Sequence, residues 1–155
     1  MDGFDLILSP SLPALPERTA GRIFEAAGEY RLSLTMADAR ALAETNASAL
    51  SHAGRLEFGP SAAERLIPAL ASSPYISPDD HAPMLHDMTE LFYALKNDTR
   101  DAVSDGELIC FIRNAFDAGG GSLEMVHDRA EALTLHIRRG GCIDDFDMGD
   151  GNGDS

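Results

Sequence analysis

The segment from Asp79 to Asn97 constrains the fold most strongly, because its bulky apolar residues recur every three or four positions. On a helix of 3.6 residues per turn, this spacing gathers them on one face. The segment is also central in the chain, so we expect the other elements to pack against it. The apolar face consists of Met84, Leu85, Met88, Leu91, Phe92 and Leu95.

Shorter segments of the same kind fill most of the chain, and capping residues mark their starts. Thr35, Ser61 and Ser104 are each followed three residues later by Asp or Glu, the pattern of a capping box. Gly28 and Gly54 are expected to stop the first two helices. Hydrophobic residues make up 44% of the 155 residues, and valine occurs only at 103 and 126. The sequence therefore predicts an all-α protein: a single compact helical domain of roughly six helices over residues 1–143.

The two ends of the chain differ from this helical pattern. Residues 2–15 are apolar but contain two prolines, Pro10 and Pro13, so we expect an extended strap that lies on the helical body. Residues 144–155 are rich in Asp and Gly and have little apolar content. This composition predicts a disordered acidic tail.

The charge and the cysteines limit the class of partner and the compartment. The formal net charge of -14 repels phosphate backbones, so nucleic acid is not an expected partner; acidic mimicry of a nucleic acid stays open as an alternative. No apolar run approaches the roughly 18 residues of a membrane span, and no basic leader precedes an apolar core. Cys110 lies in an apolar run and is interpreted as a buried thiol. We expect a cytoplasmic protein that does not bind a membrane.

Several polar residues on these helices could carry chemistry. His86 and Glu90 share a helix face and Asp87 lies beside them, so a divalent metal could be held there with a further ligand such as His81. This is the hypothesis of a metal-dependent phosphohydrolase of the HD type, and the alternative is an ordinary solvated helix face. Asn46, inside an apolar face, is expected to form an interhelical hydrogen bond. Nucleophile-elbow, P-loop and dinucleotide motifs are missing, so no cofactor is predicted.

Five short segments, in a fixed order, resemble a family of small bacterial proteins of unknown function. They read GRLEFG, SSPYI, ELFYALKN, SDGELICFIRNAFD and GSLE, and the resemblance covers about residues 35–130. It implies a bacterial cytoplasmic helical protein and carries over no activity. If the family shares a binding surface, the candidates are the polar residues of these segments. They are Arg55, Glu57, Tyr75, Tyr93, Lys96, Asn97, Asp117 and Glu124.

The leading hypothesis for function is a non-enzymatic interaction or accessory protein. It would bind another protein through a groove or an end of the helical bundle. Tyrosine is favoured at interfaces, so exposure of Tyr75, Phe92 or Tyr93 as a patch would support this hypothesis.

Overall fold

The computed structural model describes residues 16–55, 57, 59–76 and 81–146, and this part of the chain contains six α-helices and no strand. The predicted all-α domain of six helices is confirmed. The strap expected over residues 2–15 and most of the expected acidic tail lie outside the described residues. The helices are α1 (Pro16–Glu29), α2 (Met36–Ala53), α3 (Ala62–Ala71), α4 (His81–Asp98), α5 (Asp105–Ala118) and α6 (Leu123–Arg138), followed by the short 3-10 helix η2 (Ile143–Asp145).

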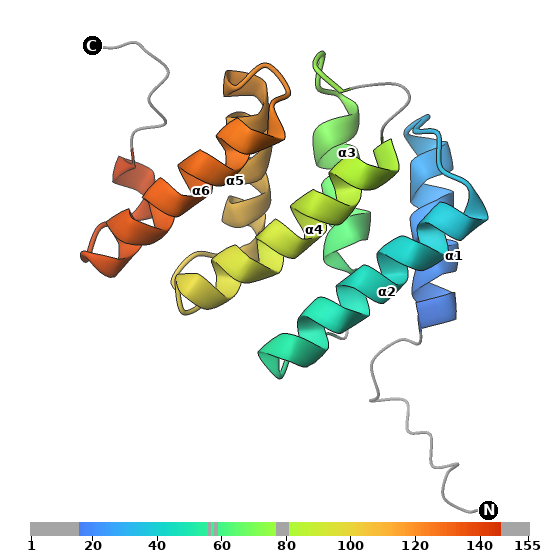
Figure 1. Cartoon of the computed structure of the whole chain (residues 1–155), viewed down its shortest axis with the longest axis horizontal. Coiled ribbons are helices and arrows are strands. Elements are labelled where there is room, and N and C mark those ends of the chain that lie inside the picture. Colours follow the sequence, from blue (N-terminus) through green and yellow to red (C-terminus); the bar gives the residue numbers. More distant parts are fainter. Residues whose placement is uncertain (1–15, 56, 58, 77–80, 147–155) are drawn as a thin grey trace, which may run out of the picture.

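The helices form two layers, as Figure 1 shows. Helices α2, α4 and α6 lie side by side in the front layer, and α1, α3 and α5 lie behind them. Each consecutive pair is a helical hairpin, and the three hairpins stack in a row so that each packs on the next. This is the arrangement of a short α-solenoid, in which stacked helix pairs share a continuous core.

Helix α4 is at the centre of this arrangement, as its apolar face predicts. It packs on α2 and α6 within the front layer and on α3 and α5 behind it. Leu85, Met88 and Phe92 are fully buried, with no exposed surface. Burial of apolar area is the main favourable term in folding, so α4 supplies the largest share of the common core.

Reciprocal capping fixes where three helices begin. The side chains of Thr35, Ser61 and Ser104 accept hydrogen bonds from the third residue of their helices, and the Asp or Glu there accepts one from the cap backbone. These bonds satisfy amide groups that would otherwise lack partners. Gly54 ends α2 with φ of 68°, a left-handed conformation that costs glycine least. The predicted caps of these helices are confirmed.

Two local predictions are wrong. Helix α1 continues past Gly28 to Glu29, and the chain reverses at Arg31, whose φ is 63°. Cys110 is exposed rather than buried, because α5 turns Leu108 and Phe111 towards the core and position 110 then points away from it.

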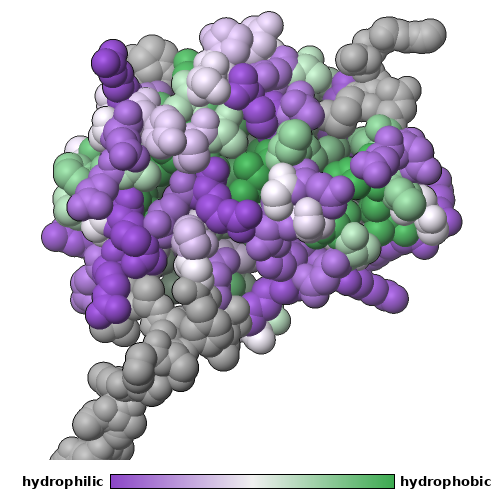
Figure 2. Space-filling view, turned by 180° about the vertical axis from the view of Figure 1, so that it is seen from behind, coloured by the Kyte–Doolittle hydropathy of each residue, from purple (hydrophilic) through white to green (hydrophobic). Residues whose placement is uncertain are grey.

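The rear layer carries further apolar surface near the C-terminal end. Figure 2 shows this face, on which hydrophobic residues gather at the centre and on the side of the C-terminus. The ring of Phe146, a residue expected in the acidic tail, lies 5.9 Å from the ring of Phe111 and 5.4 Å from that of His136. The helical body therefore extends to residue 146.

Candidate functional site

A buried polar cluster joins α2, the link that follows it and α4. The Tyr93 hydroxyl donates a hydrogen bond to Glu57 Oε2 at 2.6 Å and lies 3.2 Å from Asn46 Oδ1. Asn46 and Tyr93 are 4% and 2% exposed. Burial raises the pKa of Tyr93, and the hydrogen bond and negative charge of Glu57 raise it further. The expected interhelical hydrogen bond of Asn46 is confirmed, and the cluster ties the front layer to the link before α3.

Two further groups of charged side chains lie beside this cluster. Arg55 donates to Asn97 Oδ1 and to Asp101 Oδ1, both at 2.7 Å. Asp105, at the start of α5, lies 2.7 Å from Lys96 Nζ and 3.1 Å from Arg65. Burial alone would raise the pKa of Asp105, but the hydrogen bonds and charges of Lys96 and Arg65 outweigh it and lower that pKa.

Replacing Asp105 by asparagine should therefore lower the free energy of unfolding at pH 7 by about 1 kcal/mol. A carboxylate whose pKa is lowered by folding stabilises the native state above its unfolded pKa, about 3.9, and that contribution disappears as the pH falls. The difference between wild type and variant should thus shrink below about pH 4. Urea unfolding at pH 7 and pH 3 measures it, with Glu44→Gln on the exposed face of α2 as the matched control; an equal loss in both variants contradicts the prediction.

The remaining predicted binding residues lie near the rear layer and on α6. Asp117 accepts hydrogen bonds from Ser73 at 2.6 Å and from Arg113 at 2.7 Å. Tyr75 is 50% exposed, and Glu124 is exposed in the first turn of α6.

The eight candidates thus fall into two groups. Six of them form hydrogen bonds or ion pairs between elements. The other two, Tyr75 and Glu124, face the solvent. Because Phe92 and Tyr93 are 0% and 2% exposed, no patch is formed by these residues with Tyr75. Binding by any of the eight candidates stays a prediction.

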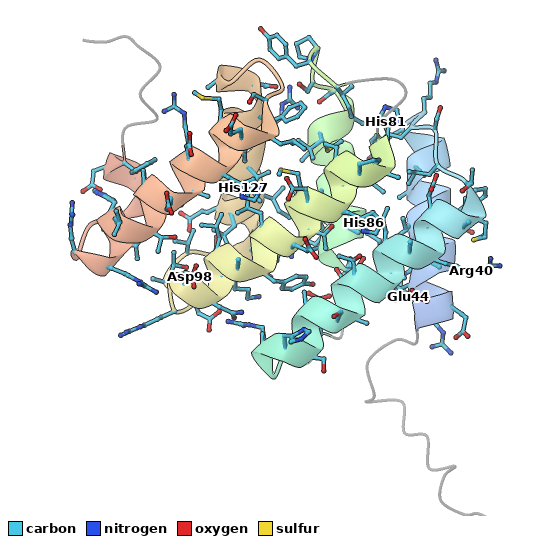
Figure 3. All side chains as sticks on the ribbon, viewed as in Figure 1. Arg40, Glu44, His81, His86, Asp98 and His127 are labelled. Atoms are coloured by element: carbon cyan, nitrogen blue, oxygen red, sulfur yellow. The ribbon has the colours of Figure 1, made fainter. Side chains whose placement is uncertain are left out.

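The structure does not bring the candidate metal ligands together. His86 Nδ1 lies 2.7 Å from the hydroxyl of Thr45 on α2, whereas both carboxylate oxygens of Asp87 lie within 3.0 Å of His127 on α6. Figure 3 shows His86 on the α2 side of α4 and His127 on the α6 side.

The other two candidates are also apart from this pair. His81, at the start of α4, accepts a hydrogen bond from the backbone of Ser33, and Glu90 is exposed. Within the described ranges, no three His, Cys, Asp or Glu side chains form a group that could hold a metal ion.

The most distinctive open feature is a groove between α4 and α6, with a volume of about 320 Å³. Its floor is apolar, since Leu91, Leu95 and Ala130 are at most 7% exposed. We name it the α4–α6 groove, and its lining residues are Leu91, Ala94, Leu95, Asp98, His127, Asp128, Ala130, Glu131 and Thr134.

Polar bridges between the two helices mark the ends of the α4–α6 groove. At one end His127 Nε2 meets the Asp87 carboxylate at 2.9 and 3.0 Å. At the other end Arg138 Nε donates to the backbone oxygen of Asp98 at 3.2 Å. His127 and Asp98 are labelled in Figure 3 and show the extent of the groove. The bridges hold the helices at a fixed separation, so the space between them is preformed.

The rim of the α4–α6 groove is acidic. Asp128 and Glu131 are exposed on α6, and neither forms an ion pair within the part of the chain that the structure describes. A cavity with an apolar floor and a few charged groups at its rim is typical of a binding site. Here the charged groups favour a cation.

A second cavity of about 430 Å³ continues from the groove, and Asp98 lines both. It lies between the loop that follows α4 and the end of α6. We name it the distal cavity, and its lining residues are Asp98, Thr99, Arg100, Ala102, Ile137 and Arg138.

Comparison with known protein families identifies the family to which the chain belongs. The model of a family of unknown function (DUF6323) matches residues 22–142. The chain belongs to this family. The membership that the sequence motifs predict is confirmed, and the match extends beyond the 35–130 on which they lie. No curated protein and no solved structure matches this DUF6323 chain, and none of its described helices is long and apolar enough to cross a membrane.

The sequence alone does not indicate the α4–α6 groove of this DUF6323 chain. Exposed acidic residues such as Asp128 and Glu131 occur on most surface helices, so neither residue indicates a binding site by itself. One signal was present: Asp87, Leu91 and Ala94 recur at spacings of four and three, a second stripe beside the apolar face of α4. That stripe shows which side of α4 is half apolar, but not that α6 lies opposite it.

Proposed function

We propose that this protein is a protein-interaction module, and that its binding site is the α4–α6 groove. The observation that carries the proposal is the combination of an apolar floor with two exposed carboxylates that have no ion-pair partner among the described residues. A basic side chain of a partner would neutralise these carboxylates while its neighbour covers the floor. The net charge of -14 would also speed the approach of a basic segment.

The stacked helix pairs support this proposal. Solenoids use the surface of one layer of parallel helices as an extended binding face, and the groove lies within such a layer. The groove and the distal cavity together extend along residues 127–138 of α6, about 16 Å at 1.5 Å per residue. This length suits a short peptide segment rather than a single small molecule.

The test uses a phage-displayed library of random twelve-residue peptides, selected on the purified full chain. We expect enriched sequences that contain Lys or Arg next to an apolar residue. Ala94 is exposed in the groove, so Ala94→Trp should fill the groove without disturbing the core. It should weaken the binding of an enriched peptide more than tenfold, as measured by fluorescence polarisation.

Ala132→Trp is the matched control, because Ala132 is exposed on α6 but does not line the groove. It should leave the affinity unchanged. Failure to enrich any sequence would overturn the proposal, as would peptides that bind the Ala94→Trp variant as tightly as the wild type.

A further inference from the structure

The two cavities between α4 and α6 carry opposite charges. The α4–α6 groove presents the carboxylates of Asp128 and Glu131, whereas the distal cavity presents the guanidinium groups of Arg100 and Arg138. Asp98 lies at the boundary and is the one carboxylate in the distal cavity, 4.0 Å from Arg138. The distal cavity therefore keeps one net positive charge.

Arg100 is the group in the distal cavity that is available to a ligand. It is exposed and has no ion-pair partner within the described residues. Its φ of 55° lies in the left-handed region that reverses the chain after α4. The nearby Asp101 carboxylate is already paired with Arg55 at 2.7 Å, so it offsets the charge of Arg100 only weakly.

The end of α4 would repel an anion if its last carbonyl groups were free, because a helix C-terminus carries a partial negative charge. They are not free. The last four carbonyl oxygens accept hydrogen bonds from the chain itself: Leu95 from Thr99, Lys96 from Asp101, Asn97 from Arg100 and Asp98 from Arg138. The distal cavity is thus suited to a negatively charged group.

We infer that the groove and the distal cavity together bind one extended segment of a partner protein that carries a basic and an acidic side chain. This inference rests on the proposed function and adds which charges the partner segment carries and how far apart they stand. Arg138 lines the distal cavity together with Arg100 and marks the position of that cavity along α6. Glu131 and Asp128 precede Arg138 by seven and ten residues, about 10–15 Å at 1.5 Å per residue. An extended chain advances about 3.3 Å per residue, so the basic and acidic residues of the partner stand about three to five positions apart.

The experiment repeats the phage selection on the wild-type chain and on the variant Arg100→Glu. Peptides selected on the wild type should contain Lys or Arg and, three to five positions away, Asp or Glu. An enriched peptide should bind the Arg100→Glu variant about tenfold more weakly, and changing its acidic residue to lysine should restore the affinity for that variant. This exchange of charges tests direct pairing, which a folding defect cannot imitate.

Arg40→Glu on α2 makes the same change in net charge at an exposed site away from both cavities (Figure 3), and it should leave the affinity unchanged. Enriched peptides with a basic residue but no acidic one overturn this inference and leave the proposed function standing. An equal loss in the Arg40→Glu variant also overturns it, since the effect would then come from total charge. If no peptide is enriched, both fail.

Discussion

Replacing Phe92 by alanine should lower the free energy of unfolding by about 3–5 kcal/mol, the usual cost of removing a buried phenylalanine ring. The ring is completely buried and packs edge-on against Tyr93, with 5.0 Å between the ring centres. It belongs to the helix on which four others pack, so the surrounding structure has little freedom to collapse into the space left behind. Denaturation in urea measures the loss as a lower midpoint at an unchanged slope.

Phe24→Ala is the control for this variant. The chemical change is the same, but Phe24 is 41% exposed on α1, and the expected loss is below about 1 kcal/mol. Similar losses in the two variants would show that α4 does not hold the central place in the core that its burial indicates.

Tyr93→Phe should cost about 1–3 kcal/mol at pH 7, although it removes only one oxygen atom. The hydroxyl donates its one proton to Glu57, and without it the Glu57 carboxylate loses that partner inside a largely buried cluster. Thermal or urea unfolding at pH 7 checks this loss. Tyr30→Phe, with Tyr30 46% exposed, should be nearly neutral, and an equal effect of the two changes would contradict the prediction.

The free energies of unfolding of the wild type and of Tyr93→Phe should become more similar in alkaline solution. Folding raises the pKa of Tyr93 through burial and through Glu57, so the phenol stabilises the native state fully below the unfolded pKa of about 10. Above that pH the unfolded chain loses the proton first, and wild type should lose stability by up to about 1.4 kcal/mol for each pH unit. Tyr93→Phe lacks this contribution, so the gap between the two should close as the pH rises from 10 to 11.

Local features of the fold could be predicted from the sequence because their physical causes are local. A capping box needs two side chains three residues apart, and the reciprocal bonds of Thr35 with Asp38 and of Ser61 with Glu64 follow from that spacing alone. The burial of Phe92 follows from helical periodicity in the same way. Cys110 shows where a local rule misleads, since apolar neighbours do not fix the side of the helix on which a residue lies.

The stacking of the helix pairs could not be predicted. An apolar face indicates that a helix is covered by another element, but it does not indicate which element covers it. The candidate site depends on that stacking. Arg55 and Asn97 could be grouped from short motifs, and the structure places them in contact. Asp98 and Asp128 come from separate segments, and only the position of α6 beside α4 makes them the rim of one groove.

The stacked arrangement also bears on how quickly the chain can find its native state. Extensive packing is confined to helices in the same hairpin or in adjacent hairpins, and none of it joins α1 or α2 to α5 or α6. The substantial contacts therefore join helices separated by at most one other helix in the chain, which limits the entropy lost in closing each loop. Proteins dominated by such near-neighbour contacts fold in microseconds to milliseconds. A nascent chain could complete its first hairpins while the last helices are still being synthesised.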